Sequence, residues 1–325
     1  MKRLFVLLMA LLCTSCTALP SEERAFAVAL CAEKQDGVWR VYARIPAYKA
    51  GGEYLTVSGK GTDIASALDE MNAAAPMQTS LSQLRLLVLS DRLTPEDVFA
   101  LLTHMSAQYD VRQQCAIAVT DASANAAADA LRPEAGTRLS KAIDVLLEAR
   151  TGQGSVPKAT LADVVRMGER QSPVLMRLLL QDGKADLSGA YPMGTGGFIL
   201  PPLNADETIL LSMLRGDAKV CILTADGVTT RVRDVCAKVT LSDDLRTARV
   251  ALTMTALSSD LSQEALAQAC AKLLSRLSAD GCDALGLGRK LAVRVRDLQE
   301  WQALKWPERL REIQWEAAVR VDVPA

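Results

Sequence analysis

The spacing of hydrophobic and polar positions predicts alternating strands and helices in the first half of the chain. Residues 25–32 are almost wholly apolar, and apolar residues alternate with Arg40, Tyr42 and Arg44 in the next segment, which predicts a hairpin with one buried face. Capping signals at Thr62 and Thr94 predict two helices. Further strands are expected at 54–61, 84–89, 115–119 and 174–180, further helices at 122–131, 139–150 and 160–170, and a flexible loop at 151–155. This order predicts a sheet covered by helices.

The second half changes in composition. Glycine and proline crowd residues 189–202, and we place a boundary near Asp182. Asn204 and Glu207 form a capping box for a helix that Gly216 ends. Strands are then expected at 219–224, 228–232, 237–241 and 248–256, followed by a long helix at 262–280, a tryptophan-bearing helix and a terminal strand at 313–323. We predict an α+β protein with mixed sheets covered by helices, in regions 16–182 and 183–325, the second split into two lobes near residue 240.

The N-terminus has the pattern of a lipoprotein signal peptide. Lys2 and Arg3 precede an apolar run at residues 4–12, which is far shorter than the ~20 residues of a membrane-spanning helix. Cys13-Thr14-Ser15-Cys16 follows, and its end is similar to a lipobox. We predict a signal peptide over residues 1–15 and a diacylglycerol on Cys16, whose two acyl chains suffice for stable membrane anchoring. The alternative is ordinary secretion with cleavage nearby.

Composition narrows the classes of partner and site. The formal net charge is −1 and the basic residues are spread along the chain, so nothing favours nucleic-acid binding. The other cysteines are Cys31, Cys115, Cys221, Cys236, Cys270 and Cys282, and none forms a C-x-x-C pair. Export would permit disulfides between Cys221 and Cys236 or between Cys270 and Cys282, but buried free thiols fit the pattern equally well.

The residues of common catalytic sites are missing. His104 is the single histidine, and its helical context favours a boundary position over a catalytic role. There is no G-x-S-x-G or H-E-x-x-H motif, and the segment 58–61, Ser-Gly-Lys-Gly, is too short for a P-loop. Gly286 and Gly288 are more consistent with a tight turn between helices than with a dinucleotide site, because no early βαβ unit precedes them. We therefore predict no enzyme, no cofactor and no metal.

The order of motifs in the tail resembles that of a known family. A long helix leads to Asp283-Ala-Leu-Gly-Leu-Gly288, then to Trp301 and Trp306, and then to a strand containing Trp315. This order resembles the C-terminal region of the Ger(x)C family, the C-subunit lipoproteins of spore germination receptors. The segment 57–61 and the strand at 84–90 resemble the family's N-terminal region. Thr17-Ala18 replaces the family's common Trp-Asp pair, which places the chain in a divergent branch.

The resemblance implies a function without a reaction. It implies a lipid-anchored subunit of a nutrient germinant receptor on the outer face of the spore inner membrane, beside multi-spanning A and B subunits. Direct contact with a nutrient is left open. The competing hypotheses are a solute-binding lipoprotein of a transport system and a surface enzyme. Trp301, Trp306 and Trp315 are expected to anchor the core of the last lobe, an exposed binding platform being the alternative.

Overall fold

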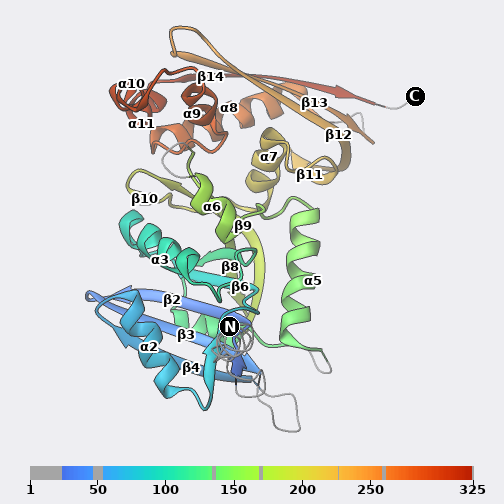
Figure 1. The fold of residues 1–325 in the computed structure, drawn as a ribbon. Helices are drawn as coiled ribbons and strands as arrows, with labels where there is room; N and C mark the ends of the chain where they lie inside the picture. The colour runs from blue at the N-terminus through green and yellow to red at the C-terminus, as the bar shows by residue number, and fades with distance from the viewer. Residues whose placement is uncertain are drawn as a thin grey trace, which may run out of the picture.

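A computed structural model of the chain describes residues 24–46, 54–133, 137–167, 171–225, 227–257 and 261–323. Figure 1 shows a large sheet below and a smaller sheet above. The elements are β1 (Arg24–Phe26), β2 (Ala29–Gln35), β3 (Val38–Pro46), β4 (Tyr54–Gly61), α2 (Ile64–Ala74), β5 (Gln78–Ser80), β6 (Leu86–Ser90), α3 (Pro95–Ala107), β7 (Ala116–Thr120), α4 (Ala124–Ala130), α5 (Leu139–Gly152), α6 (Leu161–Met167), β8 (Val174–Gln181), β9 (Lys184–Gly194), β10 (Gly197–Phe198), α7 (Ala205–Arg215), β11 (Cys221–Ala225), β12 (Val228–Leu241), β13 (Thr247–Ala256), α8 (Gln263–Ala279), α9 (Leu287–Ala292), α10 (Leu298–Leu304), α11 (Trp306–Arg311) and β14 (Gln314–Asp322).

The large sheet has eight strands in the order β10-β9-β8-β7-β6-β2-β3-β4. Its centre is parallel, because β6 pairs in parallel with both β2 and β7. Side chains that alternate along the strands fill two cores. One core contacts α2, α3 and α6, and the other contacts α4 and α5. Because both faces are covered, β6 and β7 are buried throughout, as central parallel strands are.

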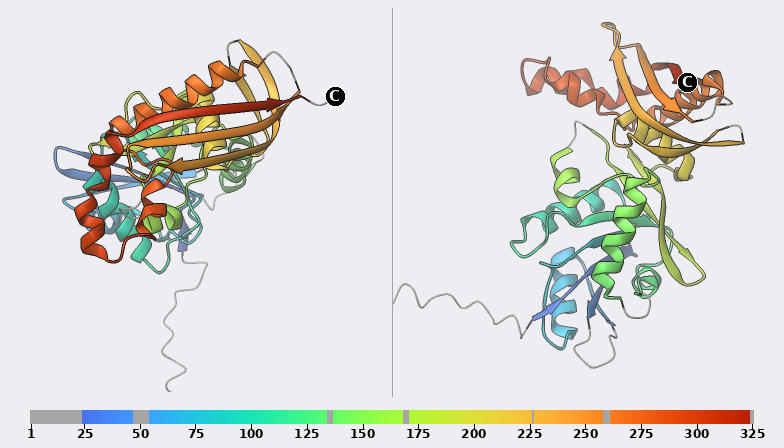
Figure 2. Two further views of the ribbon diagram at one scale, coloured as in Figure 1. Left: turned by 90° about the horizontal axis from the view of Figure 1, so that it is seen from above. Right: turned by 90° about the vertical axis from the view of Figure 1, so that its right-hand side faces the viewer.

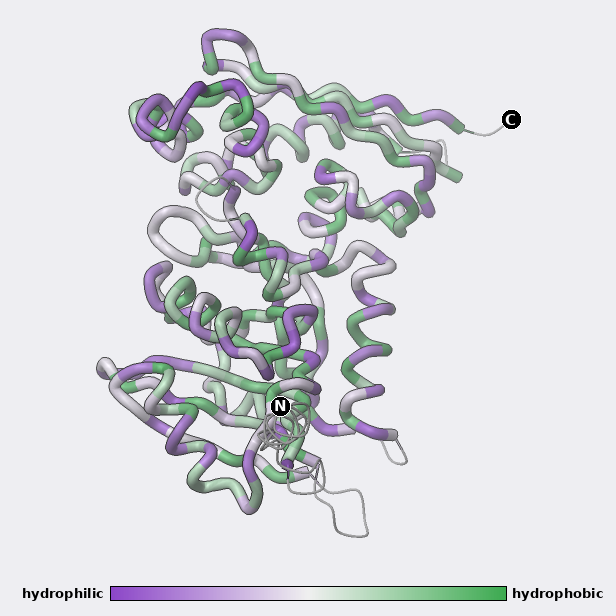
Figure 3. Tube along the Cα trace, in the orientation of Figure 1, coloured by the Kyte–Doolittle hydropathy of each residue, from purple (hydrophilic) through white to green (hydrophobic). Residues whose placement is uncertain are grey.

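The smaller sheet has the order β11-β12-β13-β14 and is covered on one face by α7 and α8. Its last two strands are parallel, and α8 to α11 connect them. Hydrophobic and hydrophilic residues alternate along β12 to β14, as expected when one face meets a core and the other meets solvent (Figure 3). The views in Figure 2 show this layer lying across one end of the large-sheet body.

The predicted α+β class is confirmed, but several element boundaries differ. The N-cap of α2 is Asp63 rather than Thr62, and it forms a capping box with Ser66. The expected strand at 25–32 is interrupted, so β1 pairs with β5 and β2 pairs with β3 and β6. The two strands expected at 228–232 and 237–241 are one strand, β12, with an irregular register between Arg233 and Cys236. The expected loop at 151–155 begins inside α5.

The glycine- and proline-rich segment holds a strand that the sequence did not predict. β9 pairs with β8 and extends the large sheet past Asp182, which lies in the turn between them. The predicted split into two lobes near residue 240 lies within the smaller sheet, beside the turn between β12 and β13. The change from one sheet to the other comes between β10 and β11 instead.

Candidate functional site

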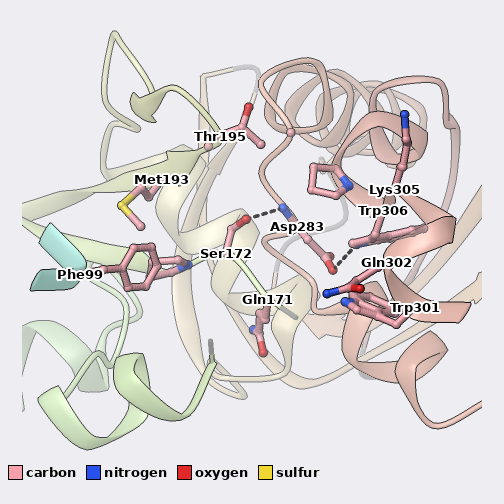
Figure 4. Close-up of a pocket in the computed structure, with 14 residues that line it drawn as sticks. Phe99, Gln171, Ser172, Met193, Thr195, Asp283, Trp301, Gln302, Lys305 and Trp306 are labelled. Carbon is pink, nitrogen blue, oxygen red and sulfur yellow. Dashed lines mark hydrogen bonds between the residues drawn. The ribbon is translucent and has the colours of Figure 1, made fainter. Parts of the chain in front are cut away.

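The segment around Asp283 lies where the smaller layer meets the large-sheet body. Asp283 is almost fully buried. Its Oδ1 accepts the Leu287 N–H at 2.8 Å, and its Oδ2 accepts the Gly288 N–H at 2.6 Å and the Trp306 indole N–H at 3.0 Å. One carboxyl group therefore fixes the start of α9 and the start of α11 together, as Figure 4 shows for Trp306.

Burial raises the pKa of the Asp283 carboxyl above its usual range, and the N–H donors from Gly288, Leu287 and Trp306 oppose that shift. The donors compensate in part for removing the carboxyl from water, since hydrogen bonds to a charged group are about twice as strong as neutral ones. This group is consequently arranged to hold backbone and indole N–H groups in place.

The glycines after Asp283 belong to the same turn. Gly286 has φ +66°, a left-handed conformation that favours glycine. A nucleotide phosphate at this turn would need the backbone N–H groups of Leu287 and Gly288. The Asp283 carboxyl already accepts both N–H groups, which agrees with a turn between helices.

Two of the three predicted anchor tryptophans are buried. Trp301 and Trp306 pack in a cluster with Leu287, Leu291, Ala248, Leu310 and Ile313. Trp315 is half-buried in β14 and donates its indole N–H to Ser278 Oγ at 2.6 Å, at the end of α8. The tryptophans thus join α8 to α11 and β14 into one packed layer, as the sequence predicted.

Main-chain contacts tie this layer to the large-sheet body. The Asp283 N–H donates to Ser172 Oγ at 2.9 Å, and the Ser172 N–H donates to the Asp283 carbonyl at 3.3 Å. The Thr195 N–H, in the turn after β9, donates to the Asp280 carbonyl at 3.1 Å. A Cβ on Gly194 would lie 2.3 Å from that same carbonyl oxygen, so glycine is required for this close approach.

A cavity of about 360 Å³ lies beside these contacts (Figure 4). Phe99 and Met193 line it from the large-sheet body, and Trp301 and Lys305 line it from the smaller layer. Its lining is mostly apolar, and the one carboxyl group in it, that of Asp283, is engaged with N–H donors. The cavity therefore resembles a gap between two packed bodies.

The other predicted features lie apart from this site. His104 is on α3, with its Nε2 3.1 Å from Gln108 Nε2. Gly59 of the Ser-Gly-Lys-Gly segment serves close packing, because a Cβ there would lie 2.2 Å from the Ala67 carbonyl oxygen in α2. The physical reason for this glycine is thus its close contact with the helix. In the described ranges, no group of His, Cys, Asp or Glu residues is arranged to hold a metal ion.

The cysteines other than Cys13 and Cys16 are all free thiols. Five are buried, Cys31, Cys115, Cys221, Cys270 and Cys282, and Cys236 is exposed. Burial raises the pKa of the Cys115, Cys270 and Cys282 thiols to about 12. Cys16, the predicted lipid attachment point, lies outside the described residues. Within the described ranges, none of the helices has the length and apolar character needed to cross a bilayer.

Comparisons with known proteins give two findings on family and fold. The family model "Spore germination protein N-terminal domain" matches residues 19–178. A solved structure, "Crystal Structure of the GerBC protein", is similar with a TM-score of 0.57 and 14% sequence identity, over 91% of this chain and 97% of that chain. No curated protein matches the sequence. The fold is thus shared with that structure over nearly the whole chain.

Proposed function

The chain belongs to the Ger(x)C family of spore germination proteins, and from that premise we propose that it is the lipid-anchored C subunit of a nutrient germinant receptor. The observation that carries the proposal is the family match over residues 19–178, together with a fold shared with the GerBC protein. The proposed partners are multi-spanning A and B subunits in the same membrane.

The proposed role is receptor assembly or signal coupling, without a chemical reaction. The Asp283 site supports this role because its polar groups bind each other: the carboxyl holds two backbone N–H groups and one indole N–H. A catalytic carboxyl needs a free acceptor or proton facing a substrate. The site is thus suited to holding the smaller layer and the large-sheet body together.

The proposed anchor is a diacylglycerol on Cys16, which would hold the folded body at the outer face of the spore inner membrane. Two acyl chains give stable binding where a single chain is marginal. Replacing Cys16 with alanine is expected to leave the protein unlabelled by radioactive palmitate and to release it into the soluble fraction. Recovery of a membrane-bound, lipid-labelled Cys16→Ala protein would refute the anchor.

Deletion in sporulating cells tests the receptor role. We expect the spores to lose their response to the nutrient while still germinating with a trigger that bypasses receptors. Affinity purification of the tagged protein from spore membranes is expected to recover a multi-spanning partner. Normal nutrient germination in the deletion strain, or saturable binding of a small nutrient by the purified protein without any membrane partner, would favour the solute-binding alternative.

A further inference from the structure

A second cavity lies in the large-sheet body, between α2 and α3, and shares no lining residue with the cavity beside Asp283. Its volume is about 280 Å³. The side chains that line it include Asn72 on α2, Thr79 on β5, His104 on α3 and Asp110 in the segment after α3. Neither the packing of the sheet nor the Asp283 site accounts for this group of polar side chains.

Two of these residues carry a buried side-chain oxygen without a hydrogen-bond partner. Thr79 is only 6% exposed, and its Oγ1 has no partner among the residues that the structure describes; the same holds for Asn72 Oδ1. Buried polar atoms are normally hydrogen-bonded, because an acceptor that is removed from water and left unpaired destabilises the fold. The pairing of Thr79 with Ala25 in β1 uses backbone groups and leaves the hydroxyl unexplained. The two oxygens therefore call for a donor inside the cavity.

The charge of the cavity favours a cationic donor. Asp69 at the exposed rim and the half-buried Asp110 line it, and no lysine or arginine of the described ranges does so. Neither carboxyl group forms an ion pair with another described residue. Asp110 Oδ2 accepts the Leu81 N–H in a long contact of 3.4 Å, and the Nε2 atoms of His104 and Gln108 lie 3.1 Å apart, so these two side chains bond to each other. Two unpaired carboxyl groups then give the cavity a negative potential.

The remaining walls favour an organic cation over a metal ion. Leu68, Met71 and Leu81 line the cavity with buried apolar side chains. A hard metal ion such as Ca²⁺ takes six to eight oxygen ligands, which a half-apolar wall does not supply. An ammonium group on a short hydrocarbon chain matches both kinds of wall, because the charged end meets the oxygens and the chain meets the apolar side chains.

We propose that this cavity binds a small primary ammonium compound. A primary ammonium has three N–H donors, and the cavity offers three acceptors, Asn72 Oδ1, Thr79 Oγ1 and the Asp110 carboxylate. Its hydrocarbon chain packs against Leu68 and Met71. The proposal does not depend on the receptor assignment.

Butylammonium is the probe, and 1-butanol is its neutral counterpart of nearly the same shape. Equilibrium dialysis of each radiolabelled compound against the purified full-length protein in detergent, with detergent alone as the blank, measures binding. We expect saturable binding of butylammonium. Butanol is expected to bind at least tenfold more weakly, because it lacks the charge and two of the three donors.

Two variants test the residues. Thr79→Val removes the unpartnered oxygen and keeps the branched shape, so it is expected to weaken butylammonium at least fivefold without lowering the melting temperature of the ligand-free protein. Asp110→Asn keeps an oxygen for the Leu81 N–H and is expected to weaken butylammonium about tenfold. The matched control is Glu96→Gln, which removes an exposed carboxylate of α3 outside the cavity and should leave the affinity unchanged.

Several outcomes would overturn the proposal. The absence of saturable butylammonium binding would mean that the cavity is only hydrated, and equal binding of butanol would mean that it is an apolar gap. Displacement of butylammonium by a lower concentration of calcium would make it a metal site. Equal weakening by Glu96→Gln and Asp110→Asn would show that the cavity does not select the charge. Butylammonium is a probe of chemistry and not a nutrient, so the deletion phenotype still decides between a receptor subunit and a solute-binding protein.

Discussion

Replacing Asp283 with alanine is expected to lower the free energy of unfolding by about 3–5 kcal/mol. The change leaves the buried N–H groups of Leu287 and Gly288 and the indole N–H of Trp306 without their acceptor. Each unsatisfied buried donor costs about 1–3 kcal/mol. Relief of the carboxyl's own desolvation, which burial imposes and which raises its pKa, offsets part of that sum.

Urea denaturation followed by tryptophan fluorescence measures this loss, because Trp306 itself reports on the site. The matched control is Asp280→Ala, an exposed acidic residue in the same turn, which is expected to change the free energy of unfolding by less than about 0.5 kcal/mol. Asp283→Asn keeps the shape but turns an amide N–H₂ toward at least one N–H donor, so an intermediate loss of about 1–3 kcal/mol is expected.

A double-mutant cycle separates the indole contact from the rest. Trp306→Phe removes the indole N–H that donates to Oδ2 together with part of a buried ring, and in combination with Asp283→Asn its effect is expected to be non-additive by at least about 0.5 kcal/mol. If Asp283→Ala lowered the free energy of unfolding by less than about 1 kcal/mol, the carboxyl would not be what holds the starts of α9 and α11 together. Additive behaviour in the cycle would show that Trp306 packs without depending on Asp283.

Three further predictions rest on single contacts. Because burial raises the pKa of Asp283, the folded protein keeps a proton on this carboxyl to a higher pH than the unfolded chain does. The free energy of unfolding is therefore expected to fall as pH rises from about 4, near the unfolded-state pKa, through the raised folded-state pKa. Urea titrations of Asp283→Asn at several pH values should lack this fall. Gly59→Ala is expected to lower the free energy of unfolding by about 1–3 kcal/mol, measured by thermal or urea denaturation. The control Gly196→Ala, which has open space around its Cβ, should be near neutral. Equal effects of the two changes would contradict the close packing of α2 on β4. Maleimide is expected to label Cys236 rapidly in the native protein and the buried thiols only after unfolding, as mass spectrometry of the labelled peptides would reveal.

Elements with local signals were predictable from the sequence. The Asn204–Glu207 capping box, the left-handed Gly216 after α7 and the Thr94 cap of α3 all occur where the sequence placed them. Each depends on residues within a few positions of one another, so the necessary interaction is visible in the sequence itself. The same holds for the β2–β3 hairpin, whose turn residues Asp36 and Gly37 both have positive φ.

Elements that depend on distant partners were not predictable in this way. β9 contains Gly189 and Pro192, residues that usually mark loops, yet it pairs along its length with β8. Gly189 adopts φ +87° and lies against the Leu203 carbonyl, a contact that the local pattern cannot reveal. Similarly, the sequence predicted a tight turn between helices after Asp283, but the acceptor role of the Asp283 carboxyl depends in part on Trp306, which lies 23 positions away.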